Sequence, residues 1–293
     1  MSQRPFSHFA AIDWSGAVGS RQRGIAVAIC AAGDVAPALV RPGHVWSREE
    51  VLDWLLHDMP TDTLVGLDLG PGLPFADAGG YFPGWTDSPP DAPSLWAIID
   101  RLASDDPHLA ASSVVDHPGL CEYFRRHGGR RGTLFGQHGQ GRFRVTELAQ
   151  RTQGLNPYSG FNLVGAAQVG KSSLTGMRVL HRLERRLPIW PFDPVPNAGS
   201  LIVEIYTSIA ALAAGRAKGR TKMRSYAELN AALTHRNIAS APVAGTGPID
   251  DHASDALLTA AWLRRATSDP ALWAPPALTP DIARTEGWTF GVR

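Results

Sequence analysis

The sequence predicts an α/β fold with a mixed five-stranded sheet, flanking helices and a large Pro/Gly-rich helical insertion. Apolar runs of strand length and amphipathic runs of helix length follow one another in the order strand, strand, strand, helix, strand, and a fifth apolar run near residue 200 is followed by helices. The 293 residues are 44% hydrophobic, enough to bury a sizeable core. We expect one domain spanning residues 1–293, with a core of about 7–70 and 200–293 and an insertion of about 71–199.

The first three strands are expected to form an antiparallel meander. Apolar runs cover residues 8–15 and 24–33, a Gly/Ser/Arg-rich turn separates them, and a weaker run covers 35–43. Strands joined by such short connections pair in antiparallel fashion. Cys30 lies inside the second run and is expected to be a buried strand residue.

A helix and a buried strand follow the meander. Ser47 is the expected N-cap, Glu50 occupies the capping-box position, and residues 51–59 carry an amphipathic helix. Residues 63–70, TLVGLDLG, are nearly all apolar, as in a buried strand. Because parallel neighbours need a crossover connection, we expect this strand to lie parallel to the first.

The rest of the chain consists of the insertion and a return to the core. Residues 71–199 are dense in Pro and Gly and contain helical stretches such as SLWAIIDRL. The fifth strand is predicted in 200–208, SLIVEIYTS. Helices around 208–214, 225–236 and 252–267 then close the chain.

The composition favours a soluble, cytoplasmic protein. No apolar run reaches the roughly 18 residues of a membrane span, and the N-terminus lacks the charged and apolar regions of a signal peptide. Cys30 and Cys121 have neither disulfide-framework nor zinc-ligand spacing. These features leave the oligomeric state open.

The net charge of +1 hides a strong asymmetry along the chain. Residues 1–110 hold 6 Lys/Arg and 14 Asp/Glu, residues 111–240 hold 18 and 7, and residues 241–293 hold 4 and 6. A basic middle segment suits a nucleic-acid partner, DNA or RNA, through its phosphates. The same charges are equally compatible with solvated faces and with helix C-termini.

Four carboxylates occupy positions typical of a ligand-binding edge. Asp13, Asp68 and Glu204 end or nearly end apolar runs, and Asp255 lies at the head of the last long helix. In open α/β sheets the carboxyl ends of the strands face the ligand crevice. Like charges gathered there need a cation, and Mg²⁺ or Mn²⁺ prefer such oxygen ligands.

Several strings sharpen this interpretation: AIDWSG, GLDLGPGLP, VGAAQVGKSSLTGM, IWPF, VEIYTS and DDHASDALLTAAW. With them the chain resembles the family of predicted ribonuclease H-like nucleases catalogued as domain of unknown function 429, over nearly its whole length. HASDA is also similar to the His-x-x-Asp-Ala ending of Holliday-junction resolvases. The resemblance implies a ribonuclease H-like fold and a metal-dependent nuclease site whose catalytic residues are Asp13, Asp68, Glu204 and Asp255.

The favoured mechanism hydrolyses phosphodiester bonds with two metal ions about 4 Å apart. Asp13 is expected to bridge the ions, Glu204 and Asp68 to complete one coordination sphere, and Asp255 to hold the second ion. Arginines or Lys171 are expected to neutralise the non-bridging phosphate oxygens.

Three further residues belong to the predicted site. Asp251 competes with Asp255 as metal ligand, because the two lie on one helix face at i and i+4. Arg178 and His252 are expected to bind substrate, His252 by orienting a phosphate or moving a proton.

Each acid also has a purely structural interpretation. Asp13 and Asp68 can be turn aspartates at strand ends, and Glu204 can form a salt bridge with an arginine at an edge strand. Asp255 can serve the helix dipole alone.

Other function classes remain open. Residues 165–172 match the P-loop pattern GxxxxGK[ST] of nucleotide triphosphatases, although the preceding FNLV is a short strand at best and Thr175 and Gly176 are expected to interrupt the helix. Actin-like ATPases share the predicted sheet, but the chain lacks a second half with a glycine-rich adenosine motif. A non-catalytic nucleic-acid-binding module is the third alternative.

Overall fold

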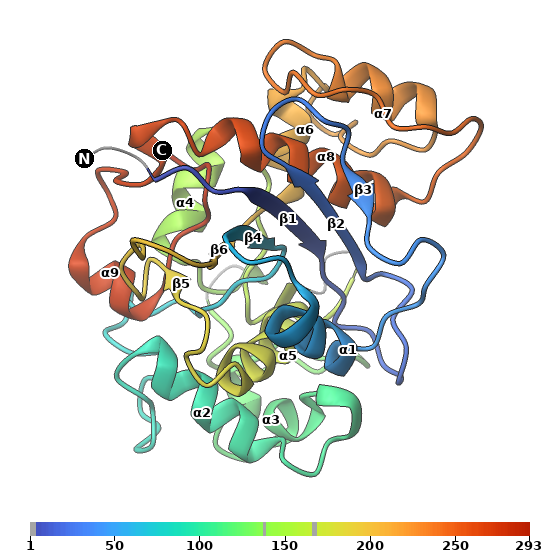
Figure 1. Ribbon diagram of the computed structural model, residues 1–293. Coiled ribbons are helices and arrows are strands. Elements are labelled where there is room, and N and C mark those ends of the chain that lie inside the picture. The colour runs from blue at the N-terminus through green and yellow to red at the C-terminus, as the bar shows by residue number, and fades with distance from the viewer. Residues whose placement is uncertain (1–3, 137–138, 166–168) are drawn as a thin grey trace.

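The structure, a computed structural model, describes residues 4–136, 139–165 and 169–293 and has a mixed α/β fold (Figure 1). Its six-stranded sheet has the order β3-β2-β1-β4-β6-β5. The strands are β1 (His8–Asp13), β2 (Ala26–Ala31), β3 (Ala38–Leu39), β4 (Thr63–Leu67), β5 (Ile189–Trp190) and β6 (Leu201–Glu204).

The predicted meander and the parallel fourth strand are confirmed. β1 pairs antiparallel with β2, so that Phe9 lies opposite Cys30, and β2 pairs antiparallel with β3. β4 is parallel to β1, and β6 is parallel to β4. The third strand is shorter than predicted, because only Ala38 and Leu39 pair between Pro37 and the turn that follows.

The prediction of five strands was wrong by one edge strand. β5 pairs in parallel with β6, Ile189 opposite Ile202 and Trp190 opposite Val203. It lies within the segment predicted as insertion. A strand of two residues is too short to show an alternating pattern in the sequence, so it can be recognised only by its pairing with β6 in the structure.

Helices cover both faces of the sheet (Figure 1). On one face α8 packs against β1 and β2, and α6 and α7 pack against α8. On the other face lie α1, α5 and α2, and α5 contacts both of the others. The α-helices are α1 (Arg48–Asp53), α2 (Ala92–Leu102), α3 (Ser112–Asp116), α4 (Val145–Thr152), α5 (Val169–Arg182), α6 (Thr207–Ala213), α7 (Tyr226–Leu233), α8 (Asp251–Ala266) and α9 (Pro280–Thr285). Short helical turns are Trp54–Asp58, which is a π-helix, and the 3₁₀ turns Pro107–Leu109, Cys121–Tyr123 and Pro270–Leu272.

Alternation along β1 divides the apolar side chains between two cores. Ala10 and Ile12 belong to the core beneath α1 and α5, whereas Phe9 and Ala11 belong to the core beneath α8. This is the two-residue period of a strand buried on both faces. Gly66 on β4 permits close packing on the α8 side, because a Cβ there would lie 2.5 Å from Ile205 and 2.9 Å from Leu263.

The segment predicted as an insertion supplies one layer of the fold. Leu174 and Met177 of α5 share a core with Ala10 and Val65 of the sheet. α5 runs unbroken to Arg182, so the predicted interruption at Thr175 and Gly176 was wrong. The glycine is needed for contact, because a Cβ on Gly176 would lie 2.4 Å from the Leu69 side chain.

Several local predictions are confirmed. Ser47 accepts from the Glu50 amide and Glu50 accepts from the Ser47 amide, which completes the capping box. Cys30 is a buried free thiol. Within the described residues, no helix has the length and apolar character that crossing a bilayer requires.

Candidate active site

The structure brings the predicted acids to one edge of the sheet. Asp13 is the last residue of β1, Glu204 is the last of β6, and Asp68 directly follows β4. These three strands are parallel neighbours, so their carboxyl ends meet. Asp255 reaches the same edge from the second turn of α8, which packs across β1.

Asp13 is buried and forms an ion pair with His252. The two side chains meet at 3.0 Å between Asp13 Oδ2 and His252 Nδ1. Burial raises the pKa of Asp13, although the hydrogen bond to His252 opposes the shift. That hydrogen bond in turn raises the pKa of His252 to about 9, which keeps the imidazolium charged near neutral pH.

Asp255 is paired with a lysine that the sequence places only within a basic cluster. Its carboxylate is 5% exposed and contacts the ammonium of Lys222, from the loop between α6 and α7. Burial raises the pKa of Asp255 to about 6, and Lys222 opposes the shift. No spacing in the sequence could have singled out Lys222, because 33 residues separate the two partners.

Asp68 is the strand-end acid whose carboxylate has no partner within the part of the chain that the structure describes. Its backbone amide donates to Ile12 at 3.0 Å, which ties it to the end of β1. Among the described residues, no group donates a hydrogen bond to its carboxylate. Burial, and then the charges of Asp13 and Asp255, raise its pKa well above the usual range.

The three acids at the start of α8 differ in function. Asp250 is the N-cap and accepts from the amides of His252 and Ala253 at 3.0 and 3.2 Å. Asp251, one turn before Asp255, adds negative charge that raises the pKa of His252. Of the two predicted metal ligands on α8, Asp251 and Asp255, Asp255 is the more buried and is the one that contacts Lys222.

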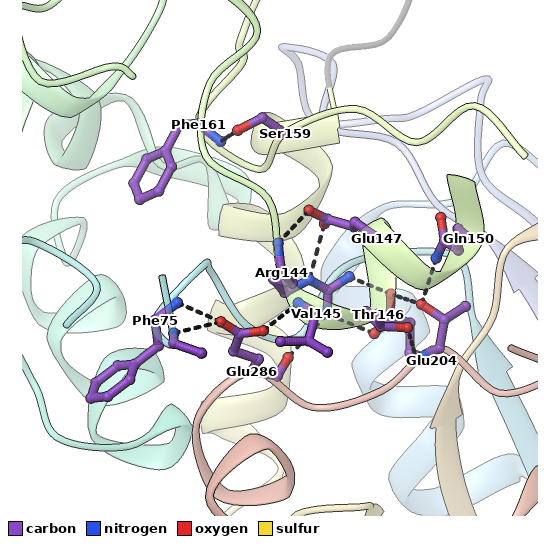
Figure 2. Close-up of polar contacts among 12 residues, drawn as sticks. Phe75, Arg144, Val145, Thr146, Glu147, Gln150, Ser159, Phe161, Glu204 and Glu286 are labelled. Atoms are coloured by element: carbon purple, nitrogen blue, oxygen red, sulfur yellow. Dashed lines mark hydrogen bonds and ion pairs between the residues drawn. The ribbon is translucent and has the colours of Figure 1, made fainter. Parts of the chain in front are cut away.

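Glu204 belongs to a closed network with Arg144 (Figure 2). The guanidinium of Arg144 donates to both carboxylate oxygens of Glu204, at 2.6 and 2.8 Å. Thr289 donates to the same carboxylate at 2.8 Å. The salt-bridge interpretation of Glu204 is therefore the observed one, although β6 is an interior strand and not an edge strand.

The network extends to two more buried acids (Figure 2). Glu147 accepts from Arg144 Nε at 3.0 Å and from the Arg144 amide at 2.9 Å. Glu286 accepts from the amides of Phe75 and Val145 at 2.7 and 2.6 Å. Burial raises the pKa of Glu147 and opposes ionisation of Arg144, but Glu204 and Glu147 raise the pKa of the guanidinium above its ordinary value.

A cavity of about 620 Å³ opens over this edge. Its wall includes Trp14, Gly16, Asp68, Arg144, Tyr158 and His252. Gly16 lets the loop after β1 pass close to α5, because a Cβ there would lie 2.4 Å from the Ser172 amide nitrogen. Tyr158 is 43% exposed and offers an aromatic face at the cavity.

Two predicted substrate-binding residues lie elsewhere. Arg178 is 1% exposed, and its guanidinium donates to Asp100 at 2.9 Å and to the Ala110 carbonyl. Because that pairing connects α5 to α2 and the loop after it, the assignment of Arg178 to substrate binding is corrected to a packing role. Lys171 contacts His127 Nε2 at 2.7 Å and lines a separate cavity of about 70 Å³.

Internal acids neutralise much of the basic middle segment. Arg126 pairs with Asp116 at 2.9 Å, and Arg142 pairs with Asp77. Arg182 and Arg178 share Asp100. Of these partners, Asp77 and Asp100 lie outside the basic segment, so pairing with acids of other segments accounts for only part of the charge asymmetry along the sequence.

The P-loop match lies partly outside the described residues, since 166–168 are not among them. In the part that is described, Asn162 forms only an isolated bridge with Arg125, and no strand leads into the motif. A P-loop needs such a strand before its glycines. The position of Lys171 beside His127, outside the main cavity, also differs from a phosphate-cradling lysine.

The chemistry of the side chains at the sheet edge suits a hard divalent cation, because they are carboxylates and no described residue donates to that of Asp68. Within the described ranges, no three His, Cys, Asp or Glu side chains are already arranged around a shared metal position. Lys222 and His252 instead neutralise two of the carboxylates.

Comparisons of the chain with protein-family models, with curated proteins and with solved structures found no match.

Proposed function

We propose that this protein is a divalent-metal-dependent nuclease that hydrolyses phosphodiester bonds of nucleic acid at the edge formed by Asp13, Asp68 and Asp255. One observation carries the proposal: β1, β4 and α8 bring these three carboxylates close enough for the charges of Asp13 and Asp255 to act on Asp68, and Asp68, which has no hydrogen-bond partner among the described residues, lines an open cavity. A carboxylate held among like charges without a partner is unfavourable unless a cation completes the site.

The strand order supports a ribonuclease H-like assignment as part of this proposal. An antiparallel meander, a parallel fourth strand and a parallel β6 carry the acids in the order that the sequence predicts. Membership in the family of domain of unknown function 429 stays a prediction from the sequence strings.

Mg²⁺ or Mn²⁺ is the proposed cofactor. Asp68 and Asp13 are the proposed ligands, and Asp255 and Asp251 add negative charge beside them. Such an ion, when bound, lowers the pKa of water and stabilises charge on phosphate oxygens. His252 is positioned to orient Asp13 and to hold a proton at Nδ1. Tyr158 supplies a surface on which a base can stack.

In this proposal Glu204 acts on the site through Arg144. The carboxylate fixes the guanidinium with two hydrogen bonds, and Arg144, which is buried and also paired with Glu147, forms part of the cavity wall. Glu204 is then a positioning residue, unlike the metal ligand that the sequence predicts.

Cleavage of labelled oligonucleotides tests the proposal. Single-stranded DNA, single-stranded RNA, duplex and four-way-junction substrates are incubated with Mn²⁺ or with EDTA, and products are resolved on denaturing gels. We expect Mn²⁺-dependent cleavage of at least one substrate, reduced by roughly a hundredfold or more in Asp68→Asn.

Asp281→Asn is the matched control, because the Asp281 side chain is 90% exposed and lies on α9. It should cleave like the wild type. Equal activity of Asp68→Asn and the wild type would contradict the proposed site. Absence of cleavage, together with absence of oligonucleotide binding by fluorescence anisotropy in Ca²⁺, would contradict the nuclease.

A further inference from the structure

We propose that Lys222 takes the place of a second metal ion, so that this site binds one divalent cation and not two. The inference rests on the proposed metal-dependent function and refines its ion count. It starts from one contact: the ammonium of Lys222 lies against the carboxylate of Asp255, the residue predicted to hold the second ion.

The backbone holds Lys222 in that position. Its neighbour Met223 is fully buried, and the Met223 carbonyl accepts from the hydroxyl of Ser254, next to Asp255, at 2.8 Å. The Arg224 carbonyl accepts from the Ile249 amide at 3.1 Å. These bonds attach the two residues that follow Lys222 to α8 and to the segment just before it, so the backbone places the lysine beside the acids although its side chain is 49% exposed.

A third bond holds the backbone of Lys222 itself. Arg216 donates to the Lys222 carbonyl at 2.9 Å and pairs with Glu228 at 3.1 Å. The backbone at Lys222 is thus linked to α7 as well as to α8.

The charge of Lys222 acts on the whole acidic group and not only on its partner. Burial raises the pKa of Asp13 and Asp68 as well as that of Asp255, and the positive charge of Lys222 opposes each shift. A cation at this place lowers the electrostatic demand for a metal ion beside Asp255, and it repels a divalent ion that approaches the same carboxylate. The carboxylate of Asp68, which has no partner among the described residues, is available to coordinate the single ion.

Isothermal titration calorimetry with Mn²⁺ tests the ion count on the full chain. We expect one ion per wild-type chain and two per chain of Lys222→Met, because loss of the ammonium frees Asp255. The affinity for the second ion should rise by roughly tenfold or more. Lys222→Arg preserves the charge and should again bind one ion.

Lys218→Met is the matched control, because Lys218 is an exposed lysine of the same loop. It should bind one ion, like the wild type. Circular dichroism of each variant verifies folding before titration. If Lys222→Met does not fold, electron paramagnetic resonance of the wild type with two equivalents of Mn²⁺ decides the question, since a coupled two-ion spectrum overturns the inference and a single-ion spectrum supports it.

The outcomes separate the inference from the function on which it rests. Two ions in the wild type would overturn the role of Lys222 and leave the nuclease proposal intact. One ion in both the wild type and Lys222→Met would also overturn it, because the lysine would then not be what excludes a second ion. No Mn²⁺ binding by the wild type would overturn the metal-dependent function itself.

Discussion

Two acidic regions share one edge of the sheet and differ in how far the protein neutralises their charge. At the end of β6, Glu204 is neutralised by the fully buried Arg144 through two hydrogen bonds (Figure 2). At the ends of β1 and β4, Asp13 meets the half-exposed His252, and Asp68 has no partner among the described residues. The first region is closed by the protein, whereas the second is open to a ligand.

The difference shows that position at a strand end does not determine what an acid does. Glu204 and Asp68 are neighbours in the sheet, since Leu67 pairs with Glu204. Arg144 and Thr289 donate to the Glu204 carboxylate, whereas no described residue donates to that of Asp68. Removing one partner of a buried ion pair strongly destabilises the folded protein. Removing the charge of an uncompensated acid stabilises the folded protein, because it ends the repulsion between like charges. The two regions should therefore respond oppositely to neutral substitutions.

The largest expected effect is the loss of Arg144. Arg144→Met leaves Glu204 and Glu147 buried without their cation, and we expect the free energy of unfolding to fall by about 3–5 kcal/mol. Urea denaturation followed by circular dichroism measures the change.

Arg151→Met is the control for Arg144, because Arg151 lies on α4, the helix that begins directly after Arg144, and is exposed and stacks on Phe143. It should lose no more than about 1 kcal/mol. If the two variants lose similar stability, the closed network does not stabilise the fold as described.

The second expected effect is a difference in sign between Glu204→Gln and Asp68→Asn. Glu204→Gln should destabilise the protein by roughly 2–3 kcal/mol, because Arg144 loses a charged partner. Asp68→Asn should stabilise the metal-free protein by about 1 kcal/mol, because it removes a charge that burial and Asp13 disfavour.

Thermal unfolding in EDTA and in excess Mn²⁺ measures this pair of variants. The gain of Asp68→Asn should disappear in Mn²⁺, which stabilises only the wild type. Stabilisation by both substitutions would show that Glu204, like Asp68, carries an uncompensated charge, and would contradict the difference between the two regions.

The smallest expected effect is a pH dependence due to His252. Its pKa in the folded protein is about 9, above the ordinary value of 6.5. The folded state therefore holds the proton more tightly, so this stabilisation is complete below pH 6.5 and is lost as the pH rises through 9. Because the side chain is 38% exposed, screening limits the effect to on the order of 1 kcal/mol.

Urea denaturation of the metal-free protein between pH 6 and pH 9.5 checks this slope. His252→Gln should show a flatter profile over the same interval, because it has no proton to release. His57→Gln is the control, since His57 is an exposed histidine on the π-helical turn and should leave the slope unchanged. Equal slopes for the wild type and His252→Gln would show that the ion pair between His252 and Asp13 does not stabilise the folded protein.

The sequence by itself determined the sheet core and the location of the acids. Strand runs of period two, the Ser47–Glu50 capping box and the apolar run before Asp68 are local patterns, and each is confirmed where it was predicted. Because parallel strands end at the same edge, the meeting of Asp13, Asp68 and Glu204 followed from the predicted order of strands.

Only the tertiary structure decided which cation meets which acid. Arg144 is 60 residues from Glu204, and Lys222 is 33 residues from Asp255. A long side chain in a loop has no periodic pattern, and its partner depends on how distant segments fold over the sheet. The same reason explains the two-residue β5, the unbroken α5 and the burial of Arg178, because each results from packing against a neighbour remote in sequence.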